Sequence, residues 1–204
     1  HVAIIGGGPA GLMAAETLAA AGIQADLFDA MPSVGRKFLL AGKGGLNLTH
    51  AEPYAAFVAR YGKRCAELDP MLREFPAQAL RDWAAGLGIT TFVGTSVRVF
   101  PDGMKAAPLL RAWQQRLRTN GVRFHVRHRW HGWTRSTGER TALFFLTPNG
   151  ERRCQANAVV LAVGGGSWAR LGSDGLWSAF LAEAGVALAP LRPANCGFDV
   201  GWSQ

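Results

Sequence analysis

Three glycines near the start of the chain, Gly6, Gly8 and Gly11, have the G-x-G-x-x-G spacing of sites that bind the pyrophosphate of a dinucleotide. Gly6 permits a tight turn, Gly8 lets a pyrophosphate approach the backbone, and Gly11 lets the following helix pack closely on the preceding strand. Pro9 and Ala10 open that helix, whose N–H groups and positive dipole end attract phosphate. We therefore predict that these five residues contact a dinucleotide.

A carboxylate follows at the distance at which such sites hold the adenosine ribose. Asp29 stands 18 residues after Gly11. It can accept hydrogen bonds from the ribose hydroxyls, and its charge repels a 2'-phosphate, so the spacing favours FAD or NAD over NADP. Ala30, the next residue, is included among the predicted contacts. A tight structural turn without a ligand is the alternative.

A strand, a helix and a second strand must position these residues. The apolar run at 2–5 predicts a strand buried on both faces. Residues 9–21 predict a helix that ends at Gly22, and residues 25–28 a second strand. Another apolar run, at 158–163, predicts a further buried strand. The sequence thus favours an α/β fold, a Rossmann-like FAD- or NAD(P)-binding domain with a mostly parallel sheet.

Gly164 and Gly165 follow that further strand, at the carboxyl edge of the sheet where open α/β folds bind ligands. The polar, glycine-rich stretch 30–50 predicts a long functional loop. The other predicted elements are helices at 53–61, 76–87, 107–119 and 176–184, short extended segments at 90–93 and 97–100, and a small β-meander whose strands include 122–133 and 141–147.

Composition excludes several classes of protein. The chain has 204 residues, of which 49% are hydrophobic, enough for one large domain or one and a half. It has no apolar stretch of membrane-spanning length and no signal peptide before the first strand, so a cytoplasmic protein that binds no membrane is expected. Three distant cysteines, Cys65, Cys154 and Cys196, argue against a disulfide framework and read as small buried hydrophobes.

Basic residues are concentrated in one segment. The net charge is +8, and residues 98–153 hold 12 basic and 3 acidic residues. Such a segment can attract nucleic acid, an anionic substrate or a phosphate-bearing cofactor. A solvated face is the favoured interpretation, because Arg111, Arg116 and Arg118 are expected on the exposed surface of a helix.

Three histidines in the same segment have a spacing that argues against a metal site. His125, His128 and His131 would lie on one strand, with His125 and His131 on one side and His128 on the other. All three side chains cannot easily coordinate one metal ion, and no Cys or carboxylate accompanies them. We therefore predict no metal. The sequence also lacks a G-x-S-x-G elbow and a Walker A loop, which leaves hydrolase and P-loop chemistry without support.

Four motifs in order carry a family resemblance: GGGPAG with Asp29, GRKFLLAGKGGLNLTH, RVFPDGMKA and VVLAVGGGSWARLGSDG. With them the chain, from residue 2 to about 196, resembles the bacterial BaiN-like or YhiN-like flavoproteins, also called the aminoacetone oxidase family. These have a glutathione-reductase-type FAD domain. In the second motif Gly45 and Leu46 replace the family's Arg-Cys pair, and His50 replaces an Asn.

The resemblance implies FAD as cofactor and assigns further contacts. Arg36 and Lys37 would lie near the ribose and phosphates, Asn47 and Thr49 nearer the flavin, and Trp130 beside the adenine. Gly164 and Gly165 would approach the dinucleotide from the other side. No catalytic acid or base is assigned. The pocket candidates are Lys43, Asn47, His50 and Lys105, with surface lysines as the alternative for Lys43 and Lys105.

The resemblance also implies a longer protein. Residues 1–195 would form an incomplete FAD-binding domain, and 196–204 would begin a β-rich substrate domain that this chain lacks, so the chain alone is expected to be inactive. The implied function is an FAD-dependent oxidoreductase that passes hydride between a small-molecule substrate and flavin N5, with oxygen or NAD(P)H as redox partner. Two alternatives are a flavoprotein acting on tRNA or another nucleic acid and a flavin-binding protein without turnover.

Overall fold

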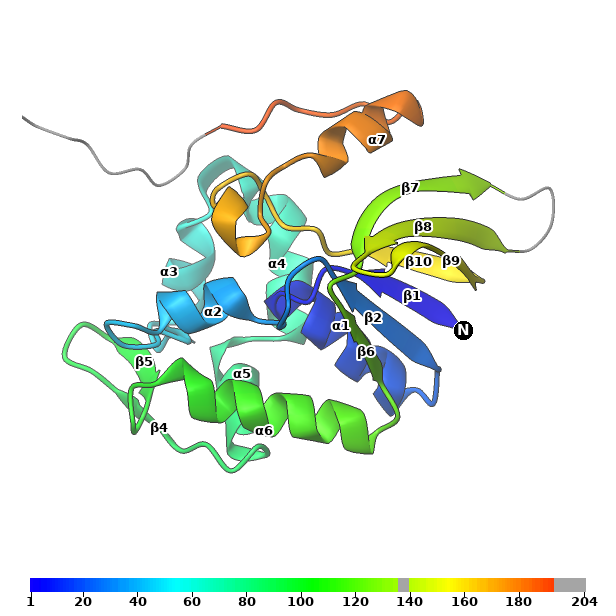
Figure 1. Cartoon of the computed structure of the whole chain (residues 1–204). Coiled ribbons are helices and arrows are strands. Elements are labelled where there is room, and N and C mark those ends of the chain that lie inside the picture. Colours follow the sequence, from blue (N-terminus) through cyan, green and yellow to red (C-terminus); the bar gives the residue numbers. More distant parts are fainter. Residues whose placement is uncertain (136–139, 193–204) are drawn as a thin grey trace, which may run out of the picture. The chain divides into compact units, whose positions relative to one another are not determined.

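Strand β1 (Val2–Ile5) lies inside a four-stranded sheet of order β10-β1-β2-β6 in the computed structural model (Figure 1). It pairs in parallel with β2 (Ala25–Asp29) and with β10 (Ala158–Leu161), and β6 (Arg123–Val126) lies next to β2. Helix α1 (Pro9–Ala20) connects β1 to β2. The predicted α/β class with a mostly parallel sheet is therefore confirmed.

The structure describes residues 1–135 and 140–192, and the chain divides into two units. The first unit consists of His1–Ala15, Ile23–Val34 and the described part of Phe124–Gln204. The second consists of Glu16–Gly22 and Gly35–Arg123. The predicted dinucleotide turn and the parallel sheet belong to the first unit.

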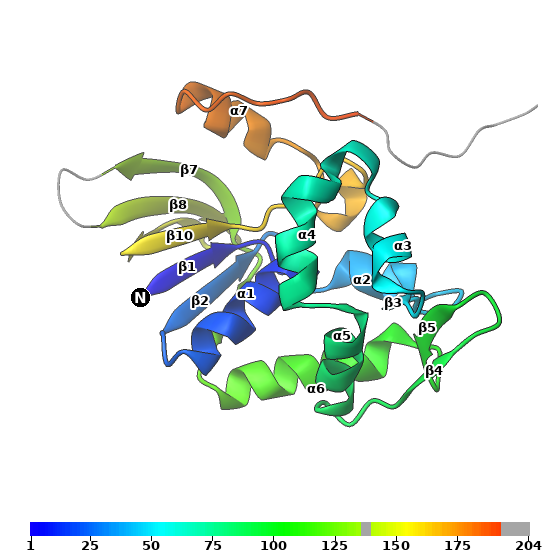
Figure 2. The same ribbon diagram turned by 180° about the vertical axis from the view of Figure 1, so that it is seen from behind.

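An antiparallel sheet covers one face of the parallel sheet in the first unit (Figure 2). Its order is β7-β8-β9, and its strands are β7 (Arg129–Arg135), β8 (Thr141–Thr147) and β9 (Gly150–Ala156). The rings of Phe28 and Phe145 stack between the two sheets at 4.3 Å. Helix α7 (Trp177–Glu183) packs on this cluster. The predicted β-meander is confirmed.

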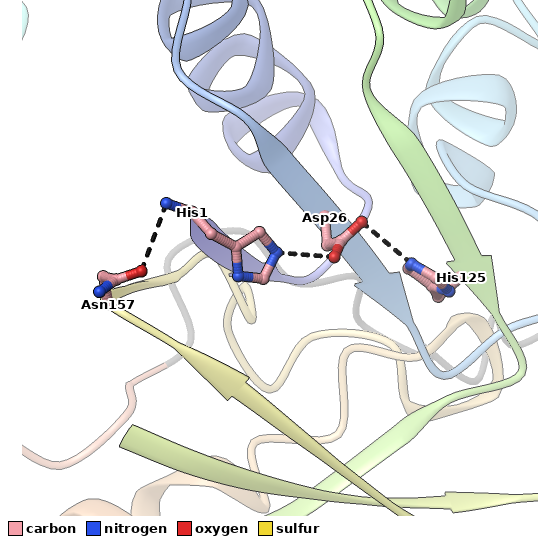
Figure 3. A network of polar contacts seen from close by, with 4 residues as sticks. All are labelled: His1, Asp26, His125 and Asn157. Carbon is pink, nitrogen blue, oxygen red and sulfur yellow. Dashed lines mark hydrogen bonds and ion pairs between the residues drawn. The ribbon is translucent and has the colours of Figure 1, made fainter. Parts of the chain in front are cut away.

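A buried carboxylate joins three parts of the first unit (Figure 3). Asp26 on β2 is 7% exposed. Its Oδ2 lies 2.7 Å from His1 Nε2 and its Oδ1 3.2 Å from His125 Nε2 on β6. The amino nitrogen of His1 reaches Asn157 Oδ1, just before β10, at 3.4 Å. A buried carboxylate needs polar partners of this kind, and here one precedes β1 and one lies on β6, while Asn157 holds His1 from the segment before β10.

The second unit holds five helices, a three-stranded antiparallel sheet of order β3-β5-β4 and a 3-10 turn (Gly62–Arg64). The strands are β3 (Thr49–His50), β4 (Thr91–Val93) and β5 (Arg98–Pro101). The helices are α2 (Arg36–Ala41), α3 (Tyr54–Ala59), α4 (Cys65–Glu74), α5 (Ala77–Ala85) and α6 (Ala106–Thr119). Leu46, Ala84, Ala106 and Leu109 form a buried core.

Three sequence expectations about the elements were wrong. The stretch 30–50 is not all loop, since Gly35 adopts a left-handed conformation (φ 70°) and starts α2, and β3 pairs with β5. The run 122–133 is not one strand, because Arg127 at φ 56° separates β6 from β7. Strand β10 is exposed or half-buried, because in the described sheet it is an edge strand.

The expectation that the arginines of α6 all lie on an exposed face was also partly wrong. Arg111 and Arg118 are exposed, but Arg116 is half-buried and forms an ion pair with Glu16. Its guanidinium also lies 5.8 Å from the ring centroid of Trp83. Part of the basic segment is therefore neutralised within the chain. No helix in residues 1–135 and 140–192 is long and apolar enough to cross a membrane.

Candidate dinucleotide site

The turn after β1 leaves no room for side chains at two of the predicted glycines. Gly6 has φ 109°, and a Cβ added there would lie 2.2 Å from the carbonyl oxygen of Ala162. A Cβ on Gly11 would lie 1.9 Å from the carbonyl oxygen of Gly6, so the helix packs on the turn itself. By contrast, nothing lies within 4 Å of a Cβ on Gly8. The backbone at Gly8 therefore has the open approach that a pyrophosphate needs.

Gly7 is a fourth required glycine, which the spacing argument missed. It is buried, and a Cβ there would lie 2.4 Å from Val34 Cγ1 and 2.7 Å from Asp29 Oδ2. The unbroken run of three glycines, Gly6 to Gly8, was the signal in the sequence that could have pointed to Gly7. Gly7 is needed because the turn packs against the chain that follows β2.

Asp29 accepts two backbone hydrogen bonds, one of which holds this turn. The N–H of Gly7 donates to Oδ2 at 2.7 Å, and the N–H of Met31 donates to Oδ1 at 2.7 Å. These bonds fix the orientation of the carboxylate, which also lines a cavity. The sequence assigned Asp29 to ribose binding and did not foresee its role in holding the turn.

A cavity of about 270 Å³ opens at the carboxyl ends of β1 and β2 in the first unit. Four residues that the sequence singled out meet there: Gly6, Asp29, Ala30 and Trp130. The lining residues that sequence reasoning did not assign to a cofactor site include His128, Arg129, His131, Asp174, Trp177 and Phe180.

Aromatic side chains form much of the cavity wall. Trp130 is 8% exposed, and its Nε1 donates to the carbonyl oxygen of Gly132 at 2.8 Å. The ring of Phe180 on α7 lies 5.1 Å from that of Trp130. Trp177 packs against the same cluster. A wall of this kind suits a flat, largely apolar ligand group.

The polar groups of the wall are held by neighbours. Arg129 Nη1 donates to Asp174 Oδ2 at 3.0 Å, and His131 Nε2 lies 3.1 Å from Glu151 Oε2. His128 Nδ1 lies 2.8 Å from the carbonyl oxygen of Val126. A carbonyl only accepts hydrogen bonds, so Nδ1 of His128 carries the proton.

The break at Arg127 explains how His128 enters this wall. The N–H groups of Arg127 and His128 donate to the carbonyl oxygens of Met31 and Asp29 at 3.0 and 2.9 Å. The break places the His128 ring 5.6 Å from that of His125, so the expectation that they lie on opposite sides was wrong. No group of three metal-ligating side chains occurs among the described residues.

Cys154 on β9 packs against the aromatic cluster behind the cavity. Burial raises the pKa of its thiol above the usual range for cysteine. The expectation of a small buried hydrophobe is met in part, because Cys154 packs in the cluster but is only partly buried. Cys65 is also partly buried and donates to the carbonyl oxygen of Val58 at 3.1 Å, whereas Cys196 lies outside the described residues.

Gly164 and Gly165 lie in the segment that follows β10. Gly164 has φ 73°, and the carbonyl oxygen of Gly165 accepts a hydrogen bond from Ser173 Oγ at 2.7 Å. Ser173 is 4% exposed. This bond closes the loop 165–173, so the bare backbone predicted there is held in one shape, although neither glycine is part of the cavity lining.

The remaining predicted residues belong to the second unit. Lys37, Lys43, Asn47 and Lys105 are exposed, and Arg36, Thr49 and His50 are half-buried. His50 Nδ1 lies 3.6 Å from Glu52 Oε1, and Glu52 also pairs with Arg60. The hydrogen bond from Arg60 lowers the pKa of Glu52. The cofactor contacts expected for this group stay predictions.

The residues of the first unit fit a dinucleotide. The fit rests on the open backbone at Gly8, the carboxylate fixed at Asp29 and the aromatic cavity beside them. Phosphate, ribose and base each have a matching surface.

Comparison with known proteins identifies a matching domain family and a distant curated relative. The model of the HI0933-like protein Rossmann domain matches residues 1–198. A 3-dehydro-bile acid delta(4,6)-reductase from Clostridium scindens is 29% identical over 202 residues, which are 95% of this chain and 46% of that protein. The chain thus spans about half the length of this curated relative.

Solved structures share the fold. A flavocytochrome c3 fumarate reductase has a TM-score of 0.63 at 22% identity, covering 81% of this chain and 33% of its own. The 3-ketosteroid-delta4-(5alpha)-dehydrogenase of Rhodococcus jostii has a TM-score of 0.57 at 16% identity. The match covers 80% of this chain and 45% of that one. The family match supports FAD as the cofactor. The chain belongs to the HI0933-like protein Rossmann domain family.

Proposed function

We propose that this chain is the FAD-binding part of an FAD-dependent oxidoreductase that passes hydride between a small organic substrate and the flavin. The observation that carries the proposal is the glycine turn locked by Ala162 and Asp29 beside the aromatic cavity. The domain-family match supports it.

The chain's own residues would bind and orient the cofactor. The open backbone at Gly8 and the first turn of α1 receive the diphosphate, and Asp29 receives the ribose. The aromatic cavity wall excludes water from the adenosine end. FAD, when bound, supplies the hydride chemistry. For Arg36, Lys37, Asn47 and Thr49 the proposed contacts remain those implied by the family resemblance.

Finer assignments are part of the same proposal. The four motifs favour the BaiN-like or YhiN-like subgroup, with residues 1–195 as the FAD-binding domain and 196–204 as the start of a substrate domain. The name of the Clostridium scindens relative supports a reductase acting on a small molecule. NAD(P)H or oxygen would then be the redox partner, and the cytoplasm the expected compartment.

The first test is the visible absorption spectrum of the purified chain before and after incubation with FAD, together with calorimetric titration of FAD, ADP and NAD. We expect FAD and ADP to bind, with FAD bound more tightly than NAD. A chain that stays colourless and binds neither FAD nor ADP would contradict the proposal. Anaerobic addition of NADH or NADPH to the FAD-loaded protein tests the donor, since a competent donor bleaches the flavin band.

A further inference from the structure

The indole N–H of Trp177 has no hydrogen-bond partner although it is shielded from solvent. Its Nε1 is buried and makes no hydrogen bond in the described structure, and Trp177 lines the cavity of the first unit. A buried donor without an acceptor is costly, and native proteins rarely keep one without a reason. An acceptor supplied by a ligand is such a reason.

The other polar side chains of the cavity wall contrast with Trp177. Asp29 accepts from two backbone N–H groups, Arg129 pairs with Asp174, and His131 pairs with Glu151. The indole N–H of Trp130, on the same wall, donates to a backbone carbonyl. Among the described residues that line the cavity, His131 Nε2 and Trp177 Nε1 are buried without a hydrogen bond. His131 Nε2 lies 3.1 Å from the carboxylate of Glu151, so Trp177 is the one with neither a hydrogen bond nor an ion pair.

Packing holds the Trp177 ring in the wall. Trp177 opens α7, and Phe180 follows three residues later, so both lie on one helix face. That face packs against the cluster that contains Trp130, with Phe180 5.1 Å from Trp130. A ring placed in this way keeps its N–H at a fixed position, which is what recognition of a ligand atom requires.

We propose that Trp177 Nε1–H donates a hydrogen bond to a ring nitrogen of the adenine of bound dinucleotide, and so makes Trp177 a specificity-determining residue. The inference rests on the proposed FAD binding. A planar base matches the aromatic wall, and the ring nitrogens at its edge accept in the plane of the ring. A pocket with a buried donor also rejects a group that lacks the acceptor.

The test is a calorimetric comparison of ADP with its 1-deaza, 3-deaza and 7-deaza analogues, each of which lacks one ring acceptor. The proteins are the wild-type chain, Trp177→Phe and the control Trp133→Phe, which changes a tryptophan of the same cluster outside the cavity lining. We expect Trp177→Phe to weaken ADP binding roughly three- to tenfold. One analogue should bind the wild-type chain more weakly than ADP does, by about the same factor. The same analogue should bind Trp177→Phe as well as ADP does.

A second readout separates ligand recognition from a structural role. Trp177→Phe removes a donor that is unsatisfied without ligand, so the ligand-free variant should melt at or above the wild-type temperature, while the rise in Tm caused by ADP becomes smaller. A ligand-free variant that melts lower and binds ADP as well as wild type overturns the inference. The same response to all three analogues, whether no loss or an equal loss, also overturns it, since no single ring nitrogen is then the acceptor. Wild-type protein that binds neither FAD nor ADP instead refutes the proposed function.

Discussion

The backbone N–H of Gly7 donates to Asp29 Oδ2 at 2.7 Å, which ties the glycine turn after β1 to the end of β2. Asp29→Ala leaves this buried N–H and that of Met31 without their acceptor. We expect a loss of about 1–3 kcal/mol in the free energy of unfolding, measured by urea denaturation. Asp82→Ala, at an exposed position, should stay within about 0.5 kcal/mol of wild type. Equal stabilities of the two variants would contradict this role of Asp29.

The same carboxylate should discriminate against a 2'-phosphate. The wild-type chain should bind 5'-AMP at least about tenfold more tightly than 2',5'-ADP, which differs from it only by the 2'-phosphate, because like charges in contact are strongly unfavourable. Asp29→Asn removes the charge and should narrow that ratio. Calorimetric titration of both ligands gives the ratio directly, and a ratio unchanged by the substitution would remove Asp29 from ribose recognition.

Two glycines of the same motif should respond differently to alanine. Gly11→Ala places a Cβ 1.9 Å from the carbonyl oxygen of Gly6, and overpacking of this kind costs about 1–3 kcal/mol or more. Gly8→Ala meets nothing within 4 Å, so its stability should change little, while its Cβ occupies the approach of the pyrophosphate and weakens ADP binding. Urea denaturation and ADP titration of both variants check this. Unchanged ADP affinity in Gly8→Ala would place the phosphates elsewhere.

Glu16 should be a major contributor to the stability of the second unit. It accepts hydrogen bonds from Trp83 Nε1 and Trp113 Nε1 and pairs with Arg116. Glu16→Ala leaves three partly buried donors unpaired, for which we expect a loss of about 2–4 kcal/mol. The matched control is Glu67→Ala, since Glu67 forms an exposed pair with Arg64 worth less than about 1 kcal/mol. Urea denaturation followed by tryptophan fluorescence measures both losses. Equal losses in the free energy of unfolding for the two variants would contradict this role of Glu16.

The thiol of Cys154 should react slowly near pH 8. Burial raises its pKa in the folded chain, so less of the reactive thiolate is present there than in the unfolded chain, whose pKa is about 8.5. This shift contributes to the free energy of unfolding. The contribution is fully present below the pKa of Cys154 in the unfolded chain and is lost as pH rises through its pKa in the folded chain. Alkylation with peptide mapping across pH 7–10 checks this, with urea-unfolded protein as the control. Equal rates in the two states would refute it.

Sequence reasoning located the elements whose signals are local. The apolar run before Gly6 and the helix formers after Pro9 determine β1 and α1 by themselves. The break at Arg127 had no such signal, because the carbonyl oxygens of Asp29 and Met31 hold it from far along the chain. Strand β9 was missed because most of its side chains are exposed and three of them are charged, so it has no clear apolar period.

The site was predictable to a similar extent. Gly6, Asp29, Ala30 and Trp130 do meet at one cavity. The glycine motif indicated the first three, and the family resemblance implied Trp130. Trp177 was missed because an apolar helix face looks the same whether it packs on a core or lines a cavity. Only the absence of an acceptor near its Nε1 in the described structure distinguishes the two.

The pairing of β1 with β10 fixes when the site can form during synthesis. Val2 and the glycine turn leave the ribosome early, but their neighbours Ala158 and Ala162 come far later in the chain. Until then β1 has an open edge, and the carbonyl that closes on Gly6 does not exist. The nucleotide-binding turn is therefore completed only once Ala162 has been synthesised, and a nascent chain that ends before Ala158 carries the whole glycine motif without the finished pocket.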